Sequence, residues 1–308
     1  MAEAPRFSIV IPCYNYGHWL ARAVNSVLAQ DGDDWDLLVI DDGSSDDTAR
    51  IARELQARHP GRLRFLTQAN RGVAATRNRG IDETRGRYLI FLDADDELAP
   101  GALAAYRELL ARMPAADLLA GAHRAVDARG RAKLQAVGKL PATPERRLRD
   151  YLFGKCIHLT GSAVAFRRGA LARRRYPEQM PSTEDIPVFS WLLASGEVAV
   201  TPAVVAIAHR HPGSLRQDVD RALAAATALI DEVFRADLMP GWALAYRDRF
   251  QAQRQLSLFR TCYLTGDGPR ALHHFHQALR AKPLLALGHW SYLGKYLRLR
   301  CGLAPRRR

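Results

Sequence analysis

Short apolar segments alternate with amphipathic ones over the first hundred residues. Four runs rich in branched and aromatic residues have the character of buried strands, at residues 7–12, 36–41, 63–67 and 87–92. Between them, apolar residues such as Leu20 and Val24 recur at helical spacing. The third helix is expected to open after Gly72 and to run to Gly86, which would cap it. The alternation predicts a mainly parallel sheet covered by helices on both faces.

The pattern is less regular after Pro100. We expect a helix near 101–112 and strands near 117–121, 161–166 and 198–206. Pro202 should confine the last strand to a sheet edge or place the proline at its start. The basic stretch 124–149 is poor in apolar residues and is interpreted as loop and short elements over the active face. From about residue 216 the periodicity is helical throughout, so a domain boundary is predicted there.

Three carboxylates follow the fourth apolar run. Ala94 separates Asp93 from Asp95, so these two side chains point the same way, and Asp96 comes next. Open α/β sheets bind ligands outside the carboxyl ends of their strands. Carboxylates crowded there repel one another unless protons or a cation neutralise them, and a hard divalent ion prefers oxygen ligands. The alternative is a solvated acidic loop.

Length, net charge and cysteine content limit the class of protein but do not identify it. The chain has 308 residues, enough for one large or two small domains, and its net charge of +13 favours an anionic partner. Nucleic acid, a phosphate-bearing substrate and an acidic membrane face all satisfy that charge. No signal peptide is recognised, and no apolar run reaches the roughly 18 residues of a spanning helix. The four cysteines lack paired spacing, which argues against zinc and disulfides and fits a cytoplasmic setting.

Four polar clusters each follow a predicted strand: residues 12–15, 41–44, 70–72 with 77–78, and 93–96. In this order and spacing they resemble the inverting glycosyltransferases of family 2, over residues 7–214. The resemblance implies an α/β fold of the GT-A type, with a Rossmann-like, mainly parallel sheet flanked by helices. Residues 1–215 would form the catalytic domain, with a nucleotide-sugar half at about 1–100 and an acceptor half at 101–215. Residues 216–308 would form a helical C-terminal region.

The resemblance also implies a donor site. Its residues would be Pro12, Tyr14, Asn15, Asp41, Asp42, Asn70, Gly72, Arg77, Asn78, Asp93 and Ala94. Pro12 and Asn15 would lie beside the base, Asp42 would bind uracil or its equivalent, and Asp41 would support the turn. One alternative is that Asp41 and Asp42 cap the N-terminus of the helix that begins near Thr48. Another is that Arg77 lies on a solvated helix face.

The same resemblance implies a metal site for Mn2+ or Mg2+. Asp95 and Asp96 are the favoured ligands, together with the phosphates of the donor. His211, in the segment 209–214 that resembles a closing loop of the family, is added to them. A surface position for His211 is the alternative.

A pair of acids precedes the apolar stretch that begins at Val188. Glu184 and Asp185 resemble the family's Glu-Asp motif, in which the second acid is the catalytic base. Asp185 would take the proton from an acceptor hydroxyl, so that one displacement inverts the anomeric carbon. Gly161, Ser162 and Glu184 would lie on the acceptor side. The alternative is that these acids only stabilise a helix N-terminus.

These expectations describe a metal-dependent, hexosyltransferase-like enzyme that moves one sugar from a nucleotide-diphosphate sugar, with a UDP-sugar favoured, to a hydroxyl acceptor. The acceptor would be a saccharide or lipid-linked, as in surface polysaccharide or glycolipid synthesis. Residues 251–255 lack the tryptophan of the Gln-x-x-Arg-Trp motif, so a processive synthase is disfavoured. A nucleotidyltransferase would need a glycine-rich loop where residues 12–15 stand. A basic nucleic-acid-binding protein is disfavoured because the arginines are dispersed.

The last segment, residues 284–308, combines leucines and aromatic residues with arginines and lysines and contains no acid. A helix of this composition can lie in a membrane interface, which would make the enzyme peripheral on the inner face of the membrane. It can equally be an ordinary amphipathic helix packed on the catalytic domain, followed by a disordered basic end. The sequence leaves both arrangements open.

Overall fold

The computed structural model describes residues 5–154, 156–180, 182–210 and 226–303. The chain divides into two compact units, Met1–Ser214 and Leu215–Arg308. Among the described residues, no helix is both long enough and apolar enough to cross a bilayer.

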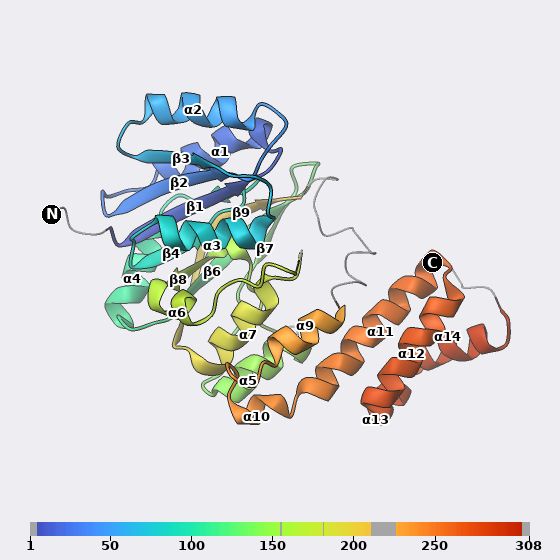
Figure 1. The fold of residues 1–308 in the computed structure, drawn as a ribbon. Helices are drawn as coiled ribbons and strands as arrows, with labels where there is room; N and C mark the ends of the chain where they lie inside the picture. The colour runs from blue at the N-terminus through green and yellow to red at the C-terminus, as the bar shows by residue number, and fades with distance from the viewer. Residues whose placement is uncertain (1–4, 155, 181, 211–225, 304–308) are drawn as a thin grey trace. The chain divides into compact units, whose positions relative to one another are not determined.

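The strands described in the first unit form one sheet in the order β3-β2-β1-β4-β8-β6-β9-β5, and β7 pairs with β6 (Figure 1). Their bounds are β1 Phe7–Cys13, β2 Trp35–Asp41, β3 Leu63–Thr67, β4 Tyr88–Phe91, β5 Glu97–Leu98, β6 Leu118–Val126, β7 Ala132–Gln135, β8 Val164–Arg167 and β9 Val198–His209. Strands β1 to β4 run parallel to one another, as predicted. The sheet as a whole is mixed, because β8 pairs antiparallel to β4 and to β6. We call β1 to β4 the parallel half of the sheet. It ends where the strict alternation of strand and helix ends in the sequence, near residue 100.

Helices cover both faces of the parallel half. The helices of this unit are α1 Gly17–Leu28, α2 Thr48–Arg58, α3 Val73–Glu83, α4 Ala102–Arg112, α5 Pro144–Arg149, α6 Arg168–Arg173 and α7 Asp185–Ser195. One core joins Ile9 of β1 to Leu20 of α1 and Tyr106 of α4. Val10 points to the opposite face, since side chains alternate along a strand. There α3 approaches so closely that a Cβ on Gly80 would lie 2.6 Å from Val10 Cγ1.

The third helix ends earlier than predicted. α3 stops at Glu83, and Thr84 follows it in extended conformation, so Gly86 does not cap the helix. Gly86 is needed for another reason. Its amide donates to Ser8 Oγ at 2.9 Å, and an added Cβ would lie only 2.5 Å from the Ser8 backbone nitrogen. The glycine therefore allows the chain to pass close to β1 before β4 begins.

Replacing Gly86 by alanine is expected to lower the free energy of unfolding by about 1–3 kcal/mol, since the methyl group can be accommodated only by moving β1. Urea denaturation followed by circular dichroism measures the change. Gly169→Ala in α6 is the matched control, because its Cβ would have only Arg167 Nε within 4 Å, at 3.9 Å. Equal stability of the two variants would show that the approach to Ser8 is not tight.

The position of β9 corrects a second prediction. β9 lies between β6 and β5 and is not an edge strand, and Pro202 is not at its start. The register with β6 shifts here, since Gly121 pairs with Thr201 and Ala122 with Val204. Pro202 and Ala203 therefore occupy a bulge, where a proline deprives the ladder of no hydrogen bond.

The basic stretch 124–149 contains short elements, as expected, and β6 extends into it beyond the predicted end at residue 121. β7 and α5 lie within it, and a π-helical turn at Asp150–Gly154 follows. A second short turn, Gly161–Ala163, leads into β8.

The described part of the second unit is helical, as the periodicity predicted. Its helices are α9 Ala226–Val233, α10 Gly241–Leu244, α11 Arg247–Thr265, α12 Gly268–Ala281, α13 Pro283–Gly288 and α14 Trp290–Arg300. Phe259 of α11 and Phe275 of α12 lie at the centre of its core, with their ring centroids 5.2 Å apart.

Candidate active site

The first polar cluster is joined to the turn after β2 by Asn15. Its side-chain oxygen accepts from the Ser45 backbone amide at 2.8 Å, and the Asn15 backbone amide donates to Ser44 Oγ at 2.8 Å. Asn15 adopts a positive φ of 57°, a conformation that asparagine tolerates better than most residues. Pro12 is buried within β1, whereas the Tyr14 ring is 47% exposed. The turn is thus held by side-chain bonds, and Tyr14 is open to solution.

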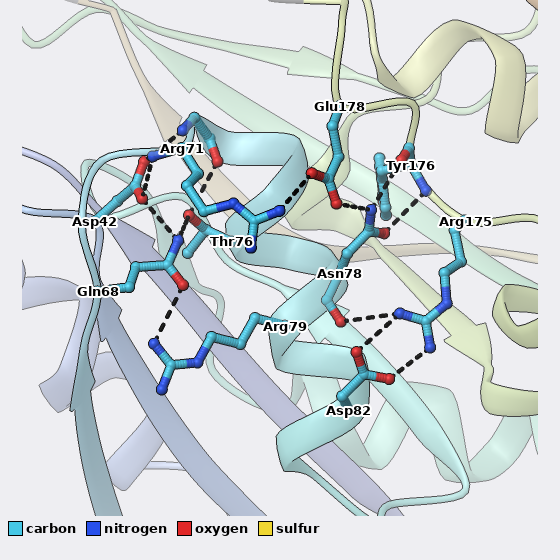
Figure 2. A network of polar contacts seen from close by, with 11 residues as sticks. Asp42, Gln68, Arg71, Thr76, Asn78, Arg79, Asp82, Arg175, Tyr176 and Glu178 are labelled. Atoms are coloured by element: carbon cyan, nitrogen blue, oxygen red, sulfur yellow. Dashed lines mark hydrogen bonds and ion pairs between the residues drawn. The ribbon is translucent and has the colours of Figure 1, made fainter.

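Asp41 and Asp42 fix two different loops. Asp41 Oδ1 accepts from the Ser44 amide at 3.0 Å, which supports the turn as expected. Asp42 is buried and accepts from the amides of Arg71 and Gly72 at 2.9 and 2.8 Å (Figure 2). The Thr48 amide is bonded by Asp46, so neither Asp41 nor Asp42 caps α2.

The loop before α3 packs directly on the turn after β2. Gly43 has a φ of +76°, and a Cβ on it would lie 2.8 Å from the Asn70 amide nitrogen. Gln68 bridges the two segments, since its amide donates to Asp42 Oδ1 at 2.7 Å and to Thr76 Oγ1 at 3.1 Å (Figure 2). Asn70 itself is exposed. The ends of β2 and β3 therefore form one rigid edge.

Asn78 points away from the acidic cluster, toward residues 176–178. Its amide nitrogen donates to the Tyr176 carbonyl at 2.9 Å and to Glu178 Oε1 at 3.1 Å, and its oxygen accepts from the Tyr176 amide at 3.0 Å (Figure 2). Glu178 also bonds Arg71 Nη2 at 3.0 Å. In this structure Asn78 thus anchors the segment that passes over α3.

Arg77 lies at the centre of the site, although it is buried in α3. One terminal nitrogen donates to Glu184 Oε1 at 2.8 Å and to Asp185 Oδ1 at 3.1 Å, and the other donates to Asp93 Oδ1 at 3.0 Å. Burial would lower the pKa of the guanidinium, but Asp185 and Asp93 hold that pKa well above its usual range. The alternative of a solvated helix face is wrong, since the side chain is only 4% exposed.

The three carboxylates of the fourth cluster do converge. One oxygen from each of Asp93, Asp95 and Asp96 lies within 4.8 Å of the other two. Ser162 Oγ donates to Asp96 Oδ2 at 2.7 Å and accepts from the Asp93 amide at 3.2 Å. Burial, reinforced by Asp93 and Asp95, raises the pKa of Asp96 well above its usual range. Asp96 is the buried member, and Asp93 and Asp95 are the partly exposed ones. Ala94 is buried between them.

Sequence reasoning missed a group that surrounds this cluster. Arg22 of α1 donates to the Asp95 carbonyl at 2.6 Å. It also lies 3.4 Å from Glu97 Oε1, to which His209 Nε2 is bonded at 2.7 Å. The His209 amide donates to Asp96 Oδ1 at 3.0 Å. Only His209 carried a sequence signal, its place in the predicted closing loop; His211 lies outside the described residues.

Asp185 begins α7, and its carboxylate reaches the same centre. Asp185 is partly exposed, whereas Glu184 is buried. An added Cβ on Gly161 would lie 3.8 Å from Asp185 Oδ2 and 3.6 Å from Arg77 Nη2, so Gly161 borders this carboxylate. The helix N-terminus accounts for an acid at position 185 but not for its bond to Arg77.

Three tyrosines also lie at the site without having been predicted. The Tyr176 ring is 5.2 Å from the Arg77 guanidinium, a cation–π contact. Burial raises the pKa of Tyr151 strongly, with a smaller effect from Asp185. Burial, together with Asp95 and Asp93, raises the pKa of Tyr16 to about 12. Burial raises the pKa of Tyr176 as well. All three hydroxyls therefore stay protonated at neutral pH.

A mixed α/β sheet with acids gathered at the carboxyl end of β4 fits the GT-A type of fold that is typical of sugar-nucleotide transferases. A model for glycosyl transferase family 2 matches residues 8–175, more than half of the chain. The chain therefore belongs to glycosyl transferase family 2 and is a glycosyltransferase. This result favours sugar transfer over nucleotidyl transfer and nucleic-acid binding.

Several relatives match about a third of the chain. Chondroitin synthase of Escherichia coli is 42% identical over 103 residues, 33% of this chain and 15% of the relative. A GalNAc(5)-diNAcBac-PP-undecaprenol beta-1,3-glucosyltransferase of Campylobacter jejuni is 37% identical over 101 residues, 32% of each chain. The alignments thus span less than a third of these relatives. The succinoglycan biosynthesis protein ExoO of Rhizobium meliloti is 27% identical over 97% of this chain and 98% of its own.

Solved structures share the fold over almost the whole length. S. aureus TarS 1-349 in complex with UDP-GlcNAc matches with a TM-score of 0.71 at 21% identity, covering 97% of this chain and 92% of that one. A mannosyltransferase from Pyrobaculum calidifontis in complex with GDP-Man and Mn2+ matches with a TM-score of 0.57 at 18% identity, covering 97% and 85%. At these identities the likeness establishes the fold alone.

Proposed function

We propose that this glycosyltransferase moves a single sugar from a nucleotide-diphosphate sugar to a hydroxyl acceptor, with inversion and with help from a divalent metal. The observation that carries the proposal is the Arg77 bridge, which joins Asp93 of the acidic cluster to Asp185 at the start of α7. A donor held by the cluster therefore presents its anomeric carbon near a carboxylate. A hexosyl, non-processive reaction fits this single site.

The donor side of the proposal is the edge formed by the ends of β1 and β2 and the loop before α3. Exposed Tyr14 and Asn70 offer a ring face and an amide, and the Asn15 and Asp42 bonds hold the backbone around them. The TarS complex with UDP-GlcNAc supports a UDP-sugar as donor. We assign recognition of the nucleotide base to the segment 12–15 and to Asp42. The Asp42 carboxylate accepts three hydrogen bonds within the protein, from Gln68, Arg71 and Gly72, and one acceptor position is left for the base.

The acidic cluster fits a divalent ion. Its oxygens lie close enough to share one cation, and carboxylates are the ligands that Mn2+ and Mg2+ prefer. Asp96 already accepts from Ser162 and His209 through both oxygens, which favours Asp95, with Asp93, as the carboxylates that meet the ion. When bound, the ion would neutralise charge on the diphosphate leaving group.

Asp185 is proposed as the base. A hydroxyl of the acceptor would give its proton to Asp185 while the hydroxyl oxygen bonds to the anomeric carbon and the bond to the diphosphate oxygen breaks on the opposite face. Arg77 orients the carboxylate, and Gly161 leaves room beside it. Glu184 and the 160–163 turn would border the acceptor. The names of the C. jejuni and R. meliloti relatives support a lipid-linked or saccharide acceptor.

The proposal is tested by a donor screen. Thermal unfolding is followed with uridine, guanosine and thymidine diphosphate sugars, each with and without manganese. A ligand at 100 times its Kd stabilises the protein by about 2.7 kcal/mol. We expect stabilisation by a UDP-sugar only when manganese is present. Stabilisation by none of the donors would contradict the proposed site.

Asp95→Ala is expected to abolish the manganese-dependent stabilisation by donor while leaving the unliganded protein at least as stable. The reason is that removing one of three crowded carboxylates relieves repulsion but takes away a metal ligand. The control is Asp33→Ala, which removes an exposed acid between α1 and β2. Donor binding that survives Asp95→Ala, or persists in excess chelator, would remove the metal from the proposal.

A further inference from the structure

The end of the chain is basic and carries no acid. Every charged residue after Asp267 is an arginine or a lysine. The described part of this stretch comprises α12, α13 and α14, which pack on α11 in the second unit (Figure 1). Its electrostatic field is therefore positive over its whole length and is complementary to an anionic partner.

One face of α14 is used for packing. Tyr292, Tyr296 and Leu299 pack against the core around Phe259 and Phe275, and the Tyr296 ring stacks on Phe275 at 4.3 Å. These positions recur at spacings of four and three residues, so they lie on one side of the helix. This face of α14 is therefore packed, as one alternative predicted, but the core that it joins belongs to the second unit, whereas the prediction placed the helix on the catalytic domain.

The opposite face of α14 is apolar as well, and it is exposed. Trp290 is 82% exposed and Leu297 is 53% exposed. They are seven residues, or two turns, apart, so they lie on one stripe with Gly294 between them. Arg298 and Arg300 follow Leu297 on either side of this stripe. Packing against the core accounts for neither the tryptophan nor the leucine.

Large exposed apolar side chains also occur in the segments next to α14. Leu284 and Leu287 of α13 are 86% and 45% exposed, and Leu303 after α14 is 51% exposed. Most of the large exposed apolar side chains described in this protein thus fall within residues 284–303. Such a concentration, rather than a scattered leucine, marks an interaction surface. We call Leu284, Leu287, Trp290, Leu297 and Leu303 the tail patch.

We propose that the tail patch lies in the interface of an anionic membrane, with the apolar side chains among the acyl chains and the flanking arginines at the head groups. A nucleic acid would satisfy the positive charge but not the exposed leucines, and a purely apolar partner would not need the charge. Tryptophan is enriched at the boundary between apolar and aqueous phases, and basic residues beside an apolar stripe are the mark of interfacial helices. Because Trp290 and Leu297 lie on the side of α14 opposite its packed face, the helix can bind without leaving its core.

The first test uses flotation of the full chain with vesicles of phosphatidylglycerol and phosphatidylcholine, or of phosphatidylcholine alone. The wild type should float with the anionic vesicles, and Trp290→Gln with Leu297→Gln should lower the bound fraction at least tenfold. Trp242→Gln is the matched control, since Trp242 in α10 is 40% exposed and lies outside the tail patch. Wild-type protein that stays in solution with both vesicles, or equal loss in the control, would overturn the proposal.

A second test separates charge from apolar contact. Arg300→Gln should weaken binding about fivefold at low salt, the factor that corresponds to about 1 kcal/mol for one basic residue near an anionic leaflet. Arg260→Gln, an exposed arginine of α11, should leave it unchanged. Analytical ultracentrifugation of the same variants measures self-association, which is the competing explanation for the tail patch. If the wild type self-associates and the Trp290 and Leu297 changes abolish self-association instead of flotation, the tail patch binds a second copy and the membrane proposal is wrong.

Discussion

Asp185→Asn is expected to lower turnover by about 100-fold or more while leaving donor affinity nearly unchanged. Asparagine keeps the shape of the side chain and can still accept from Arg77 Nη1, but it cannot take a proton from the acceptor. Initial rates of sugar transfer at saturating donor measure turnover, and calorimetric titration of the donor measures affinity.

The exposed Asp33 supplies the control, as Asp33→Asn removes a carboxylate without touching the site. A loss of donor affinity equal to the loss of turnover would assign Asp185 to donor binding. Normal turnover in Asp185→Asn would leave the reaction without the proposed base.

Arg77→Met is expected to lower the free energy of unfolding by about 3–5 kcal/mol and to abolish measurable transfer. The stability loss arises because Glu184 is buried, and its Oε2 has no hydrogen-bond partner among the described residues even with Arg77 present. Removing the guanidinium therefore leaves an uncompensated charge inside the protein. Denaturant unfolding measures the stability, and product formation measures activity.

A double variant separates the two effects. Arg77→Met combined with Glu184→Met removes both buried charges and should recover most of the lost stability, since a buried ion pair replaced by apolar side chains is often neutral or better. Activity should stay lost, because Asp93 and Asp185 still lack the residue that bridges them. Recovery of activity together with stability would reduce Arg77 to a structural role.

The parallel half of the sheet could be predicted because its signals are local. Strands β1 and β4 are buried on both faces, so continuous apolar runs such as residues 7–12 identify them directly. Gly86 and Pro202 were misjudged for the opposite reason. Gly86 is required by its close approach to β1, and Pro202 lies in a bulge opposite β6. Both strands are distant in sequence, so local residue preferences do not indicate these contacts.

The same division holds for the site. The clusters at 41–44 and 93–96 were recognisable because they follow strands, and the topology of the sheet brings such ends to one edge. The partners of Arg77 and Asn78 were not recognisable, since both residues bond side chains or backbone about a hundred positions away. Asp96 was favoured as a metal ligand through the resemblance to the family's motif, and no local pattern indicated that its two oxygens accept from Ser162 Oγ and the His209 amide.

The Arg77 bridge constrains how the enzyme can be re-engineered. Exchanging residues 101–215 with those of a relative, in order to change the acceptor, would also exchange Tyr176, Glu184 and Asp185, which surround a guanidinium belonging to the other half. A graft that omits any of these three would alter the setting of Asp93, which we propose lies on the donor side, along with the proposed acceptor side. An exchange intended to change acceptor specificity should therefore keep Tyr176, Glu184 and Asp185 together, so that their contacts to Arg77 are retained.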